Sequence, residues 1–317
     1  MPLESFRSRA LLLKVETTEG TDSVPTAALD AFQLFDGSSG VTGDVVEREI
    51  DRPFFTNTPF VVANPRAFIE GSFEIVPPSV PGNAVTGIAS TDALLRIGGM
   101  ARTLTVGPPG NTRYNPVSTL IPSATAYWYH AGTHKKITGA RAALSGITMA
   151  VGNYMRGQLR IEGNYQTVEE ATVSGLVYTA FATPRVGSTE SMALSFNGFN
   201  VEGKSLAIDF GSEQRTIEHT EARLNRITDR RATFTARLYR PTLASFNPWT
   251  AWRNGTIVPI MGTHTELDGR NTVLEVRAQI EGINEVEIDG DLGLEISGRC
   301  IATSTGGDEF LLRFNGV

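Results

Sequence analysis

The 317-residue sequence predicts a mainly β protein with two duplicated antiparallel domains, each a β-sandwich or partly closed barrel with one short flanking α-helix. Three observations predict this fold class: short apolar runs between Gly, Ser, Thr and Asn, an alternation of apolar and polar residues, and an ordered internal repeat. We expect a first domain at residues 1–170, a linker at residues 171–188 and a second domain at residues 189–317.

The strands are indicated by a period of two. Between residues 273 and 281 the even positions are apolar, and the odd positions between them are Glu, Arg, Gln and Glu. Such alternation buries one face of a strand in a sheet. Residues 67–75 and 233–239 show the same pattern, so we expect a strand in each.

One short helix is predicted in each domain. The first covers residues 92–97, after a Ser-Thr pair that supplies the cap, and ends at Gly98. The second is capped by Asn247, has Pro248 at its first helical position and ends at Gly255. Helical periodicity is scarce elsewhere.

The internal repeat relates the two domains. Gly-Thr-His occurs at residues 132–134 and again at residues 262–264. The matched residues that follow are Arg141, Ala142, Leu144, Gly146 and Ile147 in the first copy, and Arg277, Ala278, Ile280, Gly282 and Ile283 in the second. The alignment predicts a hairpin loop at residues 266–271 in the second copy, where the first has only Lys135 and Lys136.

The charge balance argues against a protein that grips phosphate backbones. The net charge is −6 and the pI is about 5.4, whereas nucleic-acid binding draws on clustered Lys and Arg. Only four lysines occur, so most positive charge is Arg, whose planar fork suits pairing with carboxylates at interfaces. The single cysteine, Cys300, excludes an internal disulfide, and no segment has the pattern of a secretion signal or a membrane span.

The residue pattern does not predict catalysis. His130 and His134 could face each other across a hairpin and bind a metal, but no third ligand suggests itself. No nucleophile elbow, phosphate loop or dinucleotide fingerprint is present. We therefore expect no enzyme, no cofactor and no metal. An aromatic platform of Tyr127, Trp128, Trp249 and Trp252 leaves open an alternative, a carbohydrate-binding β-sandwich surface protein.

Three stretches carry a resemblance to a known family. They are residues 17–26, residues 67–100 with the ending Leu-Leu-Arg-Ile-Gly-Gly, and residues 114–163. Together they resemble the major tail tube proteins of long-tailed, non-contractile bacteriophages. The resemblance implies a structural virion protein, made in the bacterial cytoplasm, that stacks as rings around a channel for DNA.

The family forms hexameric or pseudo-hexameric rings, so two domains per chain imply a trimer with pseudo-sixfold symmetry, with a true hexamer as the alternative. The resemblance also implies contact with a tape-measure protein and with tail terminator and distal tail proteins. DNA would be present only in transit, and a channel wall of net negative charge would let it slide.

Two segments, residues 45–65 and 217–231, mix carboxylates with arginines at equivalent places before matched strands. We expect them to make contacts between rings, with Phe60, Glu221 and Arg231 nearby. The candidate assembly residues are Glu47, Arg48, Glu49, Asp51, Arg52, Phe54, Phe55, Glu218, Arg223, Arg226, Asp229 and Arg230.

Overall fold

The computed structural model describes residues 8–220 and 222–317 and confirms a mainly β, antiparallel fold with two short helices. Residues 1–7 of the predicted first domain and Glu221 lie outside the described residues. The first part of the chain contributes β1 (Arg9–Val15), β2 (Ala31–Phe32), β3 (Phe35–Glu47), β4 (Phe60–Glu74), α1 (Asp92–Ile97), β5 (Met100–Thr105), β6 (Asn111–Pro116), β7 (Ala124–His130), β8 (Thr133–Ala150), β9 (Arg156–Tyr165) and β10 (Glu169–Glu170). The second part contributes β11 (Met192–Phe196), β12 (Phe199–Val201), β13 (Gly203–Asp209), β14 (Ser212–Glu218), β15 (Arg223–Arg230), β16 (Thr233–Tyr239), α2 (Pro248–Arg253), β17 (Ile257–Thr265), β18 (Asn271–Ile288), β19 (Asp291–Cys300) and β20 (Phe310–Asn315).

The two halves of the chain use the same antiparallel pairings in the same order. In the first half, β1 pairs with β7, β7 with β8, β8 with β9, β9 with β4, and β4 with β3. In the second half, β11 pairs with β17, β17 with β18, β18 with β19, β19 with β16, and β16 with β13. The helices also correspond, since α1 lies between β4 and β7 and α2 between β16 and β17.

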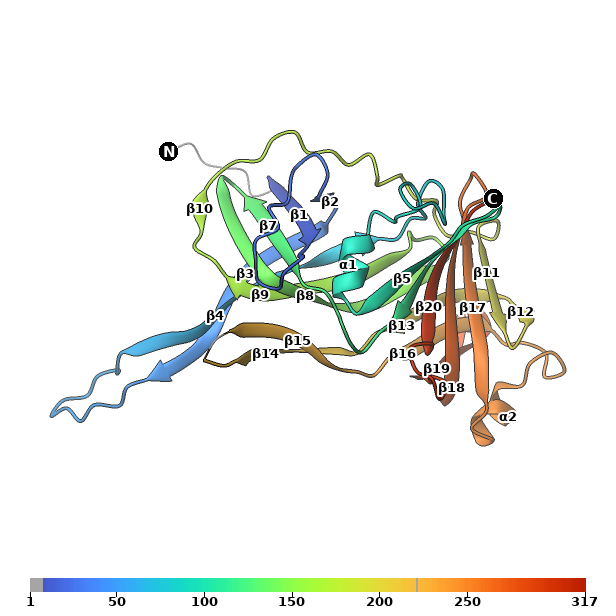
Figure 1. Ribbon diagram of the computed structural model, residues 1–317. Helices are drawn as coiled ribbons and strands as arrows, with labels where there is room; N and C mark the ends of the chain where they lie inside the picture. The colour runs from blue at the N-terminus through green and yellow to red at the C-terminus, as the bar shows by residue number, and fades with distance from the viewer. Residues whose placement is uncertain (1–7, 221) are drawn as a thin grey trace.

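The halves are joined edge to edge. The end of β8, residues 147–150, pairs with residues 205–208 of β13, so both halves belong to one 18-stranded sheet (Figure 1). A second connection runs through β6, which pairs with β5 on one side and with β20 on the other. The predicted domain boundaries stay a prediction, because strands of the first half extend the sheet of the second.

The alternating strands supply the core. In β18 the even positions from Thr272 to Ile280 are buried and the odd positions from 275 to 279 are half-buried, as the period of two predicts. The largest buried side chains include Trp128, Tyr114 and Phe73 in the first half. Burial of such side chains is the main source of stability in a sheet-rich protein.

The two helix caps differ. Asn247 caps α2 as predicted, with its side-chain oxygen accepting the Thr250 N–H at 3.0 Å. Thr91 precedes α1, but its side chain makes no capping hydrogen bond, and the helix ends at Gly98.

The prediction that Lys135 and Lys136 form the loop of the first hairpin is wrong. Both lysines lie within β8, and the turn is made by Ala131 and Gly132, whose φ angles are 49° and 78°. Positive φ at both positions is typical of a tight two-residue hairpin turn, for which Ala-Gly is a weak sequence signal. His134 therefore lies at the start of β8 while His264 lies in β17, and the two Gly-Thr-His tripeptides are not equivalent in space.

The predicted linker, residues 171–188, forms no helix or strand. It follows the surface of the first half, where Val177 donates its N–H to the Ala27 carbonyl at 3.1 Å and Phe181 packs edge-on against Phe32. No helix among the residues placed in the structure has the length and apolar character needed to cross a membrane.

Candidate assembly interface

The hairpin of β3 and β4 projects far from the rest of the chain (Figure 1). We call its outer part, residues 44–62, the arm. Nine of the 28 exposed large hydrophobic side chains in the described residues fall within residues 41–62, so apolar exposure is concentrated here. They are Val41, Val45, Val46, Ile50, Phe54, Phe55, Phe60, Val61 and Val62. A water-exposed ribbon with this much apolar surface is typical of an interaction site.

The first set of predicted assembly residues lies on this arm. Glu47 ends β3, and Arg48, Glu49, Asp51, Arg52, Phe54 and Phe55 form the connection to β4. All are exposed, and Phe55 is fully so. The Arg52 guanidinium lies 6.0 Å from the centre of the Phe54 ring, a local contact at the tip.

A second hairpin, β14 with β15, runs in the same direction as the arm but lies against β8 and β9 (Figure 1). Asn225 of β15 is its buried centre, with 1% exposure. Its side chain donates to the Glu162 carbonyl, and its own carbonyl accepts a hydrogen bond from the Arg141 guanidinium. Asn164 adds a hydrogen bond of 3.1 Å to the Arg223 carbonyl. The hairpin is thus held by polar contacts that no sequence pattern predicts, apart from Arg141 in the repeat.

The second set of predicted assembly residues is used within the chain. Arg223 pairs with Glu218 at 2.9 Å, Arg226 with Glu19 at 3.5 Å, and Arg230 with Glu309 at 2.7 Å. These ion pairs hold β15 to its own hairpin, to the first half and to the residue before β20. The structure therefore separates the two predicted segments into one covered hairpin and one uncovered arm.

Several strand edges are open among the described residues, since β5 and β12, for example, each pair with one strand only. Two others are the outer edge of β3 and the end of β18. β3 pairs with β4 on one side only. The end of β18, residues 282–288, pairs with β19 on one side only. Unpaired edges present rows of backbone N–H and C=O groups that another chain can complete.

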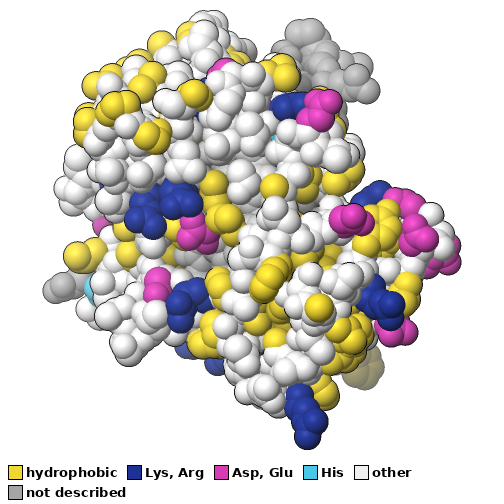
Figure 2. All heavy atoms as spheres, turned by 90° about the vertical axis from the view of Figure 1, so that its right-hand side faces the viewer, with side chains coloured by type: hydrophobic (Ala, Val, Ile, Leu, Met, Phe, Trp, Pro, Cys, Tyr) yellow, Lys and Arg dark blue, Asp and Glu magenta, His cyan; other side chains and the backbone are white. Residues whose placement is uncertain are grey.

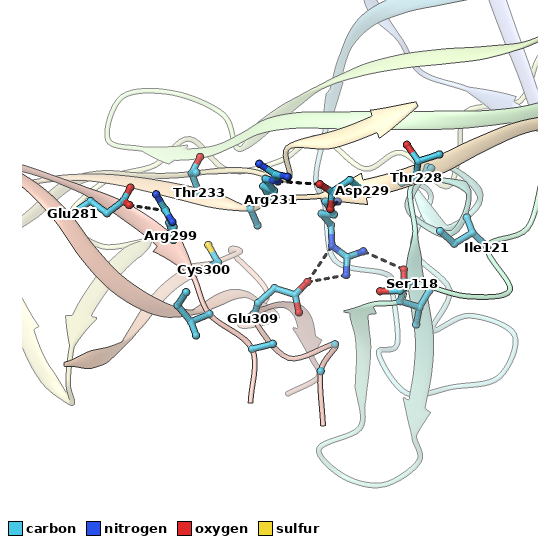
Figure 3. Close-up of a pocket in the computed structure, with 18 residues that line it drawn as sticks. Ser118, Ile121, Thr228, Asp229, Arg231, Thr233, Glu281, Arg299, Cys300 and Glu309 are labelled. Atoms are coloured by element: carbon cyan, nitrogen blue, oxygen red, sulfur yellow. Dashed lines mark hydrogen bonds and ion pairs between the residues drawn. The ribbon is translucent and has the colours of Figure 1, made fainter. Parts of the chain in front are cut away.

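A hollow of about 840 Å³ lies between β15, the β18–β19 pair and residues 301–309 (Figure 3). Its rim carries two ion pairs, Arg299 with Glu281 at 2.6 Å and Arg231 with Asp229 at 2.9 Å. Cys300 lines it as well, and burial raises the pKa of the Cys300 thiol to about 12, so the thiol is a poor nucleophile there. The hollow is a recess with a polar rim.

The aromatic platform is not formed, because Trp128 and Tyr127 are only 2% and 7% exposed. Trp252, which is half exposed, donates its indole N–H to the Glu281 carbonyl at 3.1 Å. A carbohydrate cannot stack on rings that lie in the core, so the residues proposed for that alternative are not available together.

His134 is packed between two tyrosines. Its ring stacks on Tyr129 with the centres 4.5 Å apart and meets Tyr127 edge-on. Burial lowers the pKa of His134. Within residues 8–220 and 222–317, no three His, Cys, Asp or Glu side chains are grouped as metal ligands would be.

On the face seen in Figure 2, which is the right-hand side of Figure 1, basic side chains lie in separate groups, several of them beside acidic ones. Such a face does not form the continuous basic patch that binds nucleic acid. A scan against protein-family models finds no match for the chain, and a search of curated proteins finds none either.

Proposed function

We propose that this chain is the structural subunit of a tube, of the kind that forms the tail of a long-tailed phage, in which stacked rings surround a channel for DNA. Three copies would close each ring, giving six similar β units around the axis. The resemblance of three sequence stretches to tail tube proteins supports this role, and the open strand edges supply its mechanism.

The observation that carries the proposal is the different environment of Val41 and Ile208. Val41 of β3 lies opposite Ala67 of β4, which lies opposite Gly163 of β9. Ile208 of β13 lies opposite Phe234 of β16, which in turn lies opposite Gly298 of β19. Gly163 and Gly298 end the same Leu-x-Ile-x-Gly pattern, at residues 159–163 and 294–298, so Val41 and Ile208 hold corresponding places in the two halves.

The exposure of the two side chains differs because only the strand of Ile208 has another strand on its outer side. Ile208 is fully buried beside Ile147 of β8, whereas Val41 is 57% exposed at an open edge. The strand that corresponds to β8 in the second half is β18, and its end is open as well. Pairing of β3 with the end of β18 in another copy would repeat between chains the β8–β13 junction that exists within the chain.

Repetition of this contact joins copies head to tail. A head-to-tail contact closes into a ring when the rotation between copies divides a full turn, and closure leaves neither of these two edges unpaired. With two units per chain, three copies make a pseudo-sixfold ring, and six copies remain the alternative. Stacked rings would then contact the tape-measure, terminator and distal tail proteins at their ends.

The charge of the chain suits a channel for DNA. A net charge of −6 with only four lysines gives little attraction for phosphates. DNA could therefore pass without being held.

Negative-stain microscopy and light scattering of concentrated protein test the proposal. We expect rings or tubes of uniform width, with a ring mass of three times 34.2 kDa. Val41→Lys places a charge at the open edge and should leave the chain monomeric with an unchanged circular dichroism spectrum. The control is Val80→Lys, at a residue of similar exposure (53%) in a loop, which should assemble as the unmodified chain does. A chain that stays monomeric at every concentration would refute the proposal.

A further inference from the structure

We infer that the arm of one copy seats in the hollow beside β18 and β19 of the next copy, as β14 and β15 seat on β8 and β9 within the chain. The inference rests on the proposed function, because it requires that copies join through β3 and β18. It identifies both the occupant of the hollow and the partner of the arm, and it places the arm in a contact within a ring rather than in the contact between rings that the sequence analysis expects.

The first step is that the two hairpins correspond. β14 and β15 continue β13 and β16 outward, and the Arg231 N–H bonds to the Gly211 carbonyl at 3.2 Å where the two pairs meet. Strands β13 to β16 are therefore one long hairpin with an irregular step, and β3 with β4 is its counterpart. Both point the same way in Figure 1.

The second step follows from the junction. Because β13 pairs with the end of β8, its hairpin extension lies over β8 and β9. If β3 pairs in the same way with the end of β18 in another copy, its extension must lie over β18 and β19 of that copy. The arm is that extension.

The third step is that the hollow lies at the place on the second half that corresponds to the surface under β15 on the first half. On the first half, Glu162 and Asn164 flank Gly163 and bind β15. On the second half, Gly298 is the counterpart of Gly163, and the residue after it is Arg299, on the rim of the hollow.

The arginines of the repeat agree with this placement. Arg141, which also binds β15, donates from Nε to the Ile121 carbonyl at 3.3 Å. Arg277 donates from Nε to the Ile301 carbonyl, also at 3.3 Å, and Ile301 lines the hollow. The surface that β15 covers on the first half thus has a counterpart on the second half that is uncovered.

The chemistry of arm and hollow is compatible. Ile227, Cys300 and Ile301 give the hollow apolar parts, and its rim arginines Arg231 and Arg299 have side chains that are 82% and 68% exposed. The arm brings exposed valines and phenylalanines together with four carboxylates and two arginines, a net charge of −2. Apolar contact inside a polar rim is the usual anatomy of an interface between proteins.

Counting along the strands identifies the arm residue that should reach the hollow. Thr216 lies opposite the buried Asn225 and is eight residues after Ile208. Eight residues after Val41 is Glu49. Glu49 of one copy should therefore lie near Arg299 of the next.

Thiol cross-linking between two differently labelled chains tests the inference. One chain carries Glu49→Cys and the other Arg299→Cys, both with Cys300→Ala so that no native thiol reacts. The chains are mixed before concentration and treated with a short bifunctional thiol reagent. The matched control replaces Arg299→Cys by Leu267→Cys, at an exposed residue (87%) in the β17–β18 loop. Rings are checked by microscopy in the same samples.

We expect cross-linked dimers of the Glu49→Cys chain with the Arg299→Cys chain, and few or none with the Leu267→Cys chain. If rings form but Arg299→Cys gives no mixed dimer, or no more than Leu267→Cys gives, the arm does not seat in the hollow and the proposed function is untouched. If no rings form in any sample, the proposed function itself fails and the inference falls with it.

Discussion

The Arg230 guanidinium binds one carboxylate oxygen of Glu309 through two nitrogens, with Nε at 3.0 Å and Nη2 at 2.7 Å. Its third nitrogen, Nη1, donates to the Val117 carbonyl at 3.1 Å. The side chains of both ion-pair partners are only 11% exposed. One arginine thus ties β15 to the residue before β20 and to the loop after β6.

Replacing this arginine should destabilise the fold strongly. Arg230→Met leaves the Glu309 carboxylate buried without its partner, so we expect a loss of about 3 kcal/mol in the free energy of unfolding, measured by denaturant titration. Arg231→Met is the control, because the Arg231 side chain is 82% exposed and its pair with Asp229 should contribute less than about 1 kcal/mol. Equal losses in the two variants would contradict the assigned role. The double variant Arg230→Met with Glu309→Leu should be more stable than Arg230→Met alone.

A second prediction concerns Glu16, a buried carboxylate at the end of β1. One oxygen accepts the Gly20 N–H at 2.8 Å and the Ser123 hydroxyl at 2.6 Å, and the other accepts the Thr125 hydroxyl at 2.9 Å and the Gly139 N–H at 2.8 Å.

Glu16→Gln turns one of these acceptors into a donor that faces other donors. We expect a loss of about 2 to 3 kcal/mol in thermal or denaturant unfolding. Glu190→Gln is the control, because the Glu190 side chain is 84% exposed, and this variant should unfold like the unmodified chain. An unchanged unfolding midpoint for Glu16→Gln would show that the four contacts are replaceable by water.

The two helices should respond differently to loss of their cap residues. Asn247→Ala removes the bond to the Thr250 N–H and should cost about 1 kcal/mol. Thr91→Val should cost nothing or stabilise slightly, because the Thr91 hydroxyl is buried without a hydrogen-bond partner. Denaturant midpoints of the two variants provide the comparison, and a larger loss for Thr91→Val would contradict the observed caps.

Acid should weaken the fold through His264. Its Nε2 lies 3.0 Å from the Arg185 carbonyl and its Nδ1 is buried without a partner. Burial, together with the charge of Arg185, lowers the pKa of His264. The unfolded chain then binds the proton more readily than the folded chain, so stability falls as pH drops below about 6.5. His264→Gln should lose less of its melting temperature than the unmodified chain between pH 7 and pH 5.

The neighbouring Glu266 supplies a control of opposite sign. Burial raises the pKa of Glu266, so its proton is held more tightly in the folded chain and its contribution to stability grows as pH falls. Glu266→Gln removes that gain and should make the acid loss at least as steep as in the unmodified chain. A shallower loss in Glu266→Gln than in His264→Gln would contradict both assignments.

Strand positions, the two helices and the fold class could be predicted from sequence, because each depends on local pattern. The alternation in residues 273–281 depends only on the burial of one face of the strand. The Asn247-Pro248 pair depends only on the local geometry at the start of a helix. The hairpin between His130 and His134 could be expected from the sequence, but the comparison of the two repeats misplaced its loop at Lys135 and Lys136. The positive φ of Ala131 and Gly132 comes from hairpin geometry rather than from residue preference.

The surfaces depend on long-range contacts and were predictable only in part. Mixed charges and equivalent places before matched strands single out residues 45–65 and 217–231 in the sequence. The β14–β15 hairpin is covered and the arm is bare because Asn225 contacts β8 and β9. These strands are remote from Asn225 in sequence, so the difference could not be predicted from local pattern. Likewise Tyr127 and Trp128 look like a binding platform in sequence, but their strand lies between β1 and β8 and is buried.

The strand β8 serves both halves, since it pairs with β7 and β9 along its length and with β13 at its end. A continuous backbone ladder of this kind leaves no hinge at which the halves could swivel. Any curvature of the proposed tube must therefore be absorbed where separate molecules touch, and each molecule should behave as a rigid link.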